Sequence, residues 1–245
     1  MKDAGMAHNT RRGFVSRDAV EFGARAAKIL KEAQRDILFL LDRGYRKESA
    51  VTFAGDHFRL SARQRAALVR ATCCSQAAAS RISRRKDVFT GQTVYLDGFN
   101  IIISLEAAQS LETTLLKCME GCIRDLCGLH GTYRLIADTQ TAVRWIAQFL
   151  KENCAARSVF YLDAPVSNSG NLKKLIGEIM EDEKFPADII LSQRPDAELS
   201  GKANVASGDA LVLDRCHSWI NLAARIIAWK LPGRRLVELD ADTPC

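Results

Sequence analysis

At 245 residues with 47% hydrophobic side chains, the chain is long and apolar enough to bury a substantial core, which excludes an unfolded protein. No charge-free apolar stretch reaches the roughly 18 residues of a membrane span, and the start MKDAGMAHNTRRG lacks the apolar core of a signal peptide, so we expect a cytoplasmic protein with no membrane partner. The net charge of +6 is unevenly divided, because residues 1–93 carry 19 Lys and Arg against 9 Asp and Glu (+10), whereas residues 94–245 carry 16 against 20 (−4).

Residues 1–90 are predicted to form a small, basic and mostly helical module. Apolar residues recur at helical spacing from Asp18 to about Leu41. The stretch VTFAGDHFRL (51–60) alternates poorly and predicts a short strand pair or a loop. Ser61 predicts the N-cap of a helix over residues 62–73, which the basic connector RISRRKD follows.

The basic side chains of this module are candidates for nucleic-acid binding, since a basic portion can bind a polyanion by releasing its counterions. Any one of these charges alone is also typical of a solvated helix face. We predict nucleic-acid contacts from Arg63, Arg70, Arg84, Arg85 and Lys86.

The remaining residues, 91–245, show apolar runs that alternate with helical segments. Strands are predicted at 93–98, 158–163, 187–192, 204–209 and 235–240, and helices near 104–129, 139–153, 170–183 and 209–229. Strands separated by helices of this length favour right-handed crossovers and an α/β fold, with a doubly wound parallel sheet flanked by helices.

Three of the predicted strands end on an aspartate: VYLD at Asp97, FYLD at Asp163 and VASGD at Asp209. The carboxyl ends of parallel strands lie along one edge of the sheet, so we expect the three carboxylates to share a cleft. Like charges packed together repel unless a cation lies among them, and hard oxygen ligands suit Mg²⁺ or Mn²⁺. The alternative is that each aspartate only caps the next helix, and Asp209 is suited to both roles.

Nearby residues add detail to the predicted cleft. Gly98 permits a tight turn after the first strand, and Asn100 is a candidate to orient a carboxylate or contact a phosphate. The stretch PVSNSGN after Asp163 places small polar groups, Ser167 and Asn168 among them, at a predicted helix N-terminus that favours phosphate, although a plain turn and cap fits equally well. The chain has no GxxxxGK[ST] loop, no GxGxxG after the first strand and no GxSxG elbow.

The eight cysteines are irregularly spaced, and we expect free thiols rather than a disulfide framework. Cys118, Cys122, Cys127 and His130 are close in sequence, but on one continuous helix Cys127 would point nearly opposite Cys118. This spacing argues against a structural zinc site, which needs about four converging ligands.

DGFN at 97–100, FYLD at 160–163 and Ser207-Gly208-Asp209 resemble the acidic framework of the PIN and NYN ribonuclease superfamily. The chain more closely resembles the prokaryotic family catalogued as domain of unknown function 434, with a PIN-like carboxy-terminal half. That resemblance covers most of the chain and rests on LLDRGY (40–45), LSARQRAALVR (60–70), DGFNIIISLEAA (97–108), RDLCGLHGTYR (124–134), YLDAPVSNSG (161–170) and ASGDALVLDRC (206–216).

The resemblance implies roles for particular residues. It implies that Asp97, Asp163 and Asp209 are catalytic and hold the metal, and it implies a further acidic ligand after the first strand. Glu106, Glu120 and Asp125 compete for that place, and Asp125 is favoured, while Asp214 is a weaker candidate because five positions rotate it about 140° away from Asp209. We assign substrate contacts to Asn100, Ser167, Asn168, Ser207 and Arg124, whereas His130 is more typical of a structural histidine.

The leading hypothesis from the sequence is therefore a Mg²⁺- or Mn²⁺-dependent nuclease that hydrolyses RNA phosphodiester bonds. Two alternatives remain open at this point. One is a noncatalytic protein that binds nucleic acid or a partner and keeps only the PIN-like fold, and the other is a small-molecule phosphohydrolase.

Overall fold

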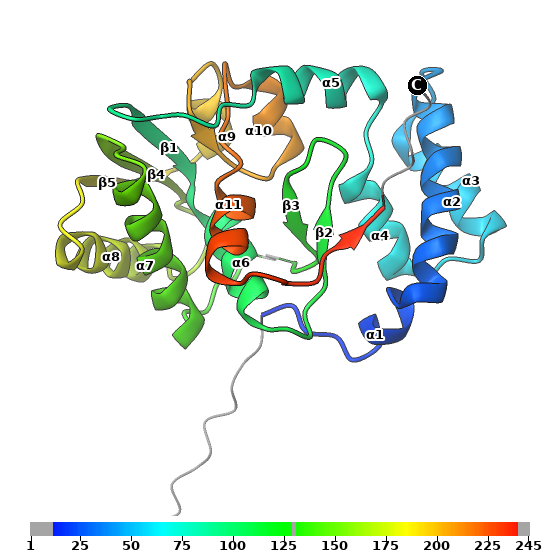
Figure 1. Cartoon of the computed structure of the whole chain (residues 1–245), viewed down its shortest axis with the longest axis horizontal. Coiled ribbons are helices and arrows are strands. Elements are labelled where there is room, and N and C mark those ends of the chain that lie inside the picture. The colour runs from blue at the N-terminus through cyan, green and yellow to red at the C-terminus, as the bar shows by residue number, and fades with distance from the viewer. Residues whose placement is uncertain (1–11, 129–130, 240–245) are drawn as a thin grey trace, which may run out of the picture.

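Four parallel strands form the main sheet of the computed structural model, which describes residues 12–128 and 131–239 (Figure 1). Their order across the sheet is β5 (Ala187–Ser192), β4 (Arg157–Asp163), β1 (Thr93–Asp97) and β6 (Val205–Ala206). The predicted parallel sheet is confirmed. β6 is shorter than predicted because Ser207 leaves the sheet, and its Oγ donates a hydrogen bond to Asp97 Oδ2 at 2.7 Å.

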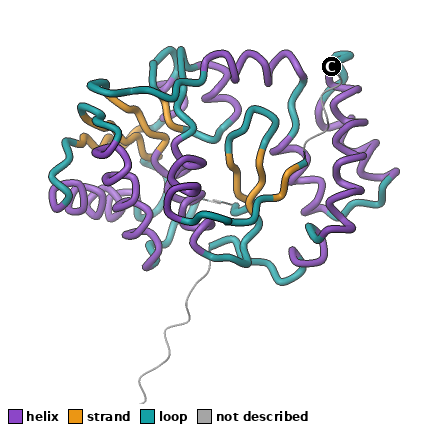
Figure 2. The backbone as a smooth tube through the Cα atoms, viewed as in Figure 1, coloured by secondary structure: helices purple, strands orange, loops and turns teal. Residues whose placement is uncertain are grey.

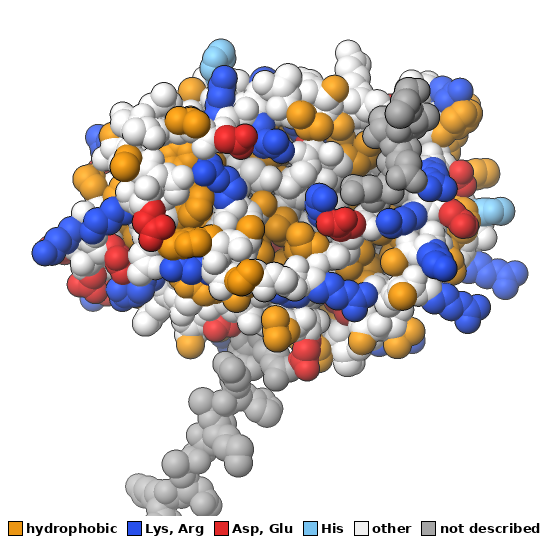
Figure 3. Space-filling model, in the orientation of Figure 1, with side chains coloured by type: hydrophobic (Ala, Val, Ile, Leu, Met, Phe, Trp, Pro, Cys, Tyr) orange, Lys and Arg blue, Asp and Glu red, His pale blue; other side chains and the backbone are white. Residues whose placement is uncertain are grey.

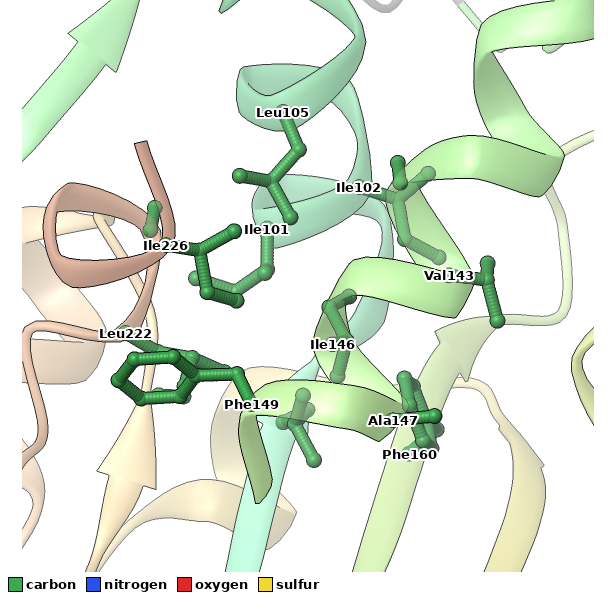
Figure 4. Close-up of a cluster of buried hydrophobic side chains, with 14 of the residues drawn as sticks. Ile101, Ile102, Leu105, Val143, Ile146, Ala147, Phe149, Phe160, Leu222 and Ile226 are labelled. Atoms are coloured by element: carbon green, nitrogen blue, oxygen red, sulfur yellow. The ribbon is translucent and has the colours of Figure 1, made fainter. Parts of the chain in front are cut away.

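The first face of this sheet is covered by the helices of the first two crossovers and by a later helix. These are α6 (Gly98–Gln109), α7 (Ala137–Glu152), α8 (Ser169–Asp182) and α11 (Leu222–Lys230). Val94 and Leu96 of β1 lie in this core, since alternate residues of a strand point to the same face. Figure 4 shows side chains from three of the helices packed with one from β4: Ile101, Ile102, Leu105, Val143, Ile146, Ala147, Phe149, Phe160, Leu222 and Ile226.

The second face is covered by α9 (Pro195–Leu199) and α10 (Ala210–Arg215). Val159 and Tyr161 of β4 and Val205 of β6 point into this second core. The connection from β5 to β6 contains α9 and therefore crosses the second face. The connections from β1 to β4 and from β4 to β5 contain α6, α7 and α8 and cross the first face. Adjacent strands β1 and β6 are therefore the place where the winding of the sheet reverses.

The amino-terminal region is helical, as predicted. It consists of α1 (Asp18–Glu21), α2 (Ala24–Leu41), α3 (Lys47–His57), α4 (Ala62–Ala71) and α5 (Ser75–Arg84), which lie at the right and top of Figure 1 and appear purple in Figure 2. Ser61 caps α4 through a capping box with Gln64, as its position in the sequence predicts. Many Lys and Arg side chains cover the right-hand edge of the molecule, over α2 and α3 (Figure 3).

Two predictions for this region are wrong. Residues 51–60 are not a strand pair or a loop, because most of them belong to α3, whose Ala50 and Ala54 are buried in the second core. The helix predicted from Asp18 to Leu41 is broken after α1, where Arg235 donates a hydrogen bond to the carbonyl of Phe22 at 3.1 Å.

A second sheet replaces much of the helix predicted at 104–129, so that prediction is also wrong. It contains the antiparallel hairpin of β2 (Leu115–Lys117) and β3 (Ile123–Asp125), and β7 (Val237–Glu238) lies parallel to β2. Gly121 turns the hairpin with a φ of 86°, a conformation that costs glycine little. β7 therefore lies outside the main sheet, and Asp240 lies outside the described residues.

The helix predicted at 209–229 is divided into α10 and α11. Between them Trp219 is extended and forms bridges with both Val205 and Arg85, which adds short pieces of chain beside β6. The helices predicted at 139–153 and 170–183 are present as α7 and α8. Within the described ranges, no helix is both long and apolar enough to cross a bilayer.

The helical region and the sheets share a hydrophobic core. Leu30, Ala54 and Leu68 from the amino-terminal helices lie in the same cluster as Leu116 of β2 and Val159 of β4. The proposed division of the chain at residue 90 stays a prediction, but the two parts are packed together through apolar side chains.

Replacing Gly98 with Ala should destabilise the fold, because an added Cβ would lie 2.4 Å from Leu162 Cδ2 and 3.0 Å from the Tyr161 carbonyl oxygen. Overpacking of this kind costs about 1–3 kcal/mol of unfolding free energy. Urea denaturation followed by circular dichroism measures the change. Gly170→Ala in α8 is the control, since an added Cβ there meets nothing within 4 Å, and an equal loss for both variants would contradict the prediction.

Candidate functional site

The ends of β1 and β6 meet at the point where the winding of the sheet reverses. Asp97 Oδ2 accepts the Ser207 hydroxyl, and Ser207 Oγ in turn accepts the backbone N–H of Asp209 at 2.9 Å. Asp209 caps α10, since its Oδ1 accepts hydrogen bonds from the backbone of Leu211 and Val212. The capping role considered for Asp209 is therefore present, and Asp97 is joined to the Ser207–Asp209 segment through Ser207, whereas the shared cleft of Asp97, Asp163 and Asp209 stays a prediction.

Asp97 is a buried carboxylate, with 7% of its surface exposed, and its side chain makes no capping hydrogen bond to α6. Burial is the largest cause that raises the pKa of Asp97 to about 7, and the hydrogen bond from Ser207 opposes this rise. Three neighbouring carboxylates raise it further, those of Asp209, Asp196 and Asp163. We name these four residues the acidic cluster.

Asp196 is the member of the acidic cluster that sequence reasoning missed. It lies in the first turn of α9, directly after Pro195, rather than at the end of a strand. Burial raises the pKa of Asp196, and the Asp209 carboxylate adds to this effect while Arg215 opposes it. Burial and Asp196 also raise the pKa of Asp163. The sequence signal that could have identified Asp196 is its position in the short segment that follows the predicted strand 187–192.

Two side chains hold the Ser207–Asp209 segment from the opposite side. Asn100 Oδ1 accepts the backbone N–H of Gly208 at 2.6 Å, and Arg124 Nε donates to the Gly208 carbonyl at 2.5 Å. Gly208 has little room there, because a Cβ would lie 3.2 Å from Asn100 Oδ1. Asn100, Ser207 and Arg124, all three predicted to contact substrate, therefore have an observed role in positioning this segment.

Arg124 is engaged inside the protein. Its other two nitrogens donate to the Arg70 carbonyl and to Glu120 Oε1, and only 12% of its side chain is exposed. The buried Glu120 also receives Arg81 at 3.2 Å. Arg124 thus joins the hairpin to the segment after β6. All three nitrogens of its guanidinium donate to acceptors within the protein.

Asp125 belongs to a different network from the acidic cluster. Its carboxylate accepts hydrogen bonds from the Ser104 hydroxyl at 2.8 Å and from the backbone of Cys127 at 2.8 Å. Ser104 lies seven positions along α6 from Asp97, which corresponds to about 10 Å along a helix. Glu106 is more remote still and is buried against Arg12, Tyr133 and Thr139.

The segment that follows Asp163 has ordinary structural contacts. Ser167 is exposed, and its backbone N–H donates to the Gly131 carbonyl. Asn168 is the N-cap of α8 with a φ of 65°, and its Nδ2 donates to the Tyr133 carbonyl at 2.7 Å. Substrate contacts from this pair stay a prediction. His130 lies outside the described residues.

The five basic residues predicted to contact nucleic acid fall into two groups. Arg63 pairs with the buried Asp18 and donates to the Leu126 carbonyl, and Arg70 donates to the carbonyls of Asp125 and Cys127. Both arginines therefore join the helical region to the end of β3 and the residues that follow it. Arg84, Arg85 and Lys86 lie at and beyond the end of α5, where Lys86 is exposed.

The donor set of the acidic cluster suits a hard divalent cation. Asp97 Oδ2 and Asp209 Oδ1 accept protein hydrogen bonds, which leaves the second oxygen of each carboxylate as a potential ligand. Among the residues that the structure describes, no three His, Cys, Asp or Glu side chains converge closely enough to enclose an ion. Mg²⁺ usually keeps several waters and needs only one or two protein carboxylates, so the cluster fits this kind of ion.

The seven cysteines described are free thiols.

Comparisons with known proteins divide the chain near the end of α5. Residues 29–84 match the family described as "Protein of unknown function (DUF434)", which confirms that resemblance over a shorter span than expected. Residues 86–225, more than half of the chain, match the family described as "Domain of unknown function (DUF5616)". The chain is also 32% identical over 187 residues to "Uncharacterized protein MJ0935" of Methanocaldococcus jannaschii, covering 75% of this chain and 88% of that protein. No solved structure matches the chain.

Replacing Asp97 with Asn should make stability less sensitive to pH. The folded-state pKa of Asp97 is raised to about 7 from 3.8, so the wild-type protein loses stability as pH rises between these values and a buried charge must form. Asp97→Asn carries no such charge. The unfolding free energy of the variant minus that of the wild type should therefore be roughly 2–4 kcal/mol larger at pH 8 than at pH 4.

Chemical denaturation at several pH values, with EDTA present, measures this difference. Asp182→Asn, at an exposed position at the end of α8, is the control and should shift stability by the same small amount throughout. A difference between wild type and Asp97→Asn that does not change with pH would show that Asp97 is readily ionised in the folded protein.

Proposed function

The chain belongs to the family described as "Domain of unknown function (DUF5616)", and from that premise we propose that it is a metal-dependent nuclease acting on RNA at the acidic cluster. The proposal includes a PIN-like character for residues 91–245. What supports it is the position of Asp97 at the end of β1 and of Asp209 just beyond β6, where the winding reverses, since open α/β sheets bind ligands at that edge.

The observation that carries the proposal is the buried Asp97 carboxylate beside three like charges. Its pKa is raised by burial and by its neighbours, with only the Ser207 hydroxyl opposing them among the main causes. A buried carboxylate whose ionisation is disfavoured by burial and by like charges, at a cost in stability, is typical of a functional site. A divalent cation removes that repulsion, and Mg²⁺ or Mn²⁺ suits oxygen ligands.

The residues of the proposed site would have three kinds of role: binding the metal ion, positioning its ligands and adding negative charge. Asp97 and Asp209 present their unoccupied oxygens, while Ser207 and Asn100 fix the distance between the ends of β1 and β6. Asp163 and Asp196 contribute negative charge from the neighbouring strand end and from α9. Mg²⁺ or Mn²⁺ held there would supply Lewis acidity toward a phosphodiester.

RNA as the substrate is supported by the distribution of charge. The first 93 residues carry a net charge of +10, and their helices pack against β2 and α10 rather than directly on the main sheet. A basic surface attracts a polyanion and raises its local concentration, whereas the acidic cluster alone would repel it.

Asp97→Asn and Asp196→Asn should each lower the rate of RNA cleavage by about a hundredfold or more, because each removes a charge that the cation would neutralise. The assay is cleavage of a mixed-sequence RNA pool by the purified full chain in Mn²⁺ or Mg²⁺, with EDTA abolishing the activity. Asp182→Asn retains every member of the acidic cluster and should cleave at the wild-type rate.

Equal cleavage by wild type and Asp97→Asn would assign the activity to another site or to a contaminant. RNA binding without cleavage, combined with no uptake of Mn²⁺ in calorimetry, would replace the nuclease with a noncatalytic nucleic-acid-binding protein. Turnover of nucleotides without affinity for RNA would instead identify a small-molecule phosphohydrolase.

A further inference from the structure

A hollow of about 500 Å³ lies between the end of α5 and the segments around α10. Figure 1 shows these two helices near one another at the top of the molecule, and α5 and α10 are in contact. The polar side chains that line the hollow include those of Arg84, Lys86, Arg215, His217 and Ser218, and its lining contains no Asp or Glu among the described residues. We name this hollow the basic pocket.

Arg84 is the fixed cation of the basic pocket. It is half-buried, and its Nε donates to the Ser80 carbonyl at 3.1 Å while its Nη1 donates to the Cys216 carbonyl at 2.7 Å. These contacts hold the guanidinium in one place before any ligand binds, so little side-chain freedom is lost on binding. Cys216 itself is buried, and burial raises the pKa of its thiol, which keeps it uncharged.

The other basic residues of the basic pocket are exposed and come from two separate segments. Lys86 lies just beyond α5 and is anchored through its backbone N–H to the Trp219 carbonyl at 2.7 Å, whereas Arg215 ends α10 and His217 lies two residues later. The carboxylates nearby are Asp214, which pairs with Arg81 at 2.7 Å, and Asp196, which lies close enough to Arg215 to interact with it.

A buried hydroxyl completes the lining. Ser218 is 3% exposed, and its Oγ accepts the backbone N–H of Asn204 at 3.0 Å. The hydroxyl therefore keeps its own hydrogen to donate. Three cations, an imidazole and a hydroxyl donor around one hollow match the needs of a phosphate group, which accepts several charge-assisted hydrogen bonds.

We propose that the basic pocket binds a phosphate monoester, supplied either by a free nucleotide or by the terminal phosphate of an RNA strand. A volume of about 500 Å³ lies within the usual size of a small-molecule site. The lining of the basic pocket contains no member of the acidic cluster, although Arg215 also interacts with Asp196. Phosphate binding at this pocket does not depend on nuclease activity.

Isothermal titration calorimetry of the full chain in EDTA tests the proposal, since cleavage is then blocked and only binding is scored. The probes are adenosine 5′-monophosphate, adenosine, and a short RNA with either a 5′-phosphate or a 5′-hydroxyl. The phosphorylated probes should bind and adenosine should not. Lys86→Ala and Arg215→Ala should each weaken binding of the phosphorylated probes by about tenfold or more.

Lys173→Ala, which removes an exposed charge from α8, is the matched control and should leave binding unchanged. Equal affinity for the mononucleotide and the phosphorylated RNA would identify a free nucleotide as a sufficient ligand, while tighter binding of the phosphorylated RNA would identify the strand terminus. Equal binding of the two RNAs, no binding of any phosphorylated probe, or binding that is insensitive to both pocket variants would overturn the proposal. Circular dichroism of each variant confirms that a loss of binding is not a loss of fold.

Discussion

The buried guanidinium of Arg124 is the contact on which the arrangement of this protein depends. A charge removed from water must be paired and hydrogen-bonded, or the fold carries a penalty of several kcal/mol. Arg124 meets this requirement with acceptors from three separate segments, namely Gly208 after β6, Arg70 at the end of α4 and Glu120 at the tip of the hairpin. Since all three must be present together, the helical region, the hairpin and β6 are tied to one geometry.

Glu120 extends this constraint to α5. Its Oε1 also receives Arg81, which pairs with Asp214 of α10 and whose carbonyl accepts the Trp219 indole N–H at 2.7 Å. The second oxygen of Glu120 is buried without a hydrogen-bond partner among the described residues, so this network is satisfied only in part. The polar chain from Arg124 to Arg81 contacts Gly208, next to Asp209, at one end and Asp214, next to Arg215 of the basic pocket, at the other. Both candidate sites are therefore built on a common support.

The strand ends were the most predictable part of the structure. An apolar run indicates a buried strand, and the carboxylate that follows it indicates where that strand leaves the core. Asp97 and Asp163 do end β1 and β4, whereas β6 ends at Ala206, three residues before Asp209. The hairpin was hidden because its strands have only three residues each, too few to show a period of two against an apolar helix pattern. Asp196 was missed because α9 is short, and only the packing of α9 against the sheet brings that carboxylate near Asp209.

The late position of β6 in the chain has a consequence for how the protein is made. β1 pairs with β4 on one side and with β6 on the other, and the residues of β6 emerge from the ribosome more than a hundred positions after those of β1. Until then β1 is an unprotected edge strand, and Arg124 has no Gly208 carbonyl to bind. Chains of this kind fold slowly and expose pairing surfaces during synthesis. A nascent chain stopped before Val205 would thus present the open edge of β1 to chaperones and to other unfinished copies.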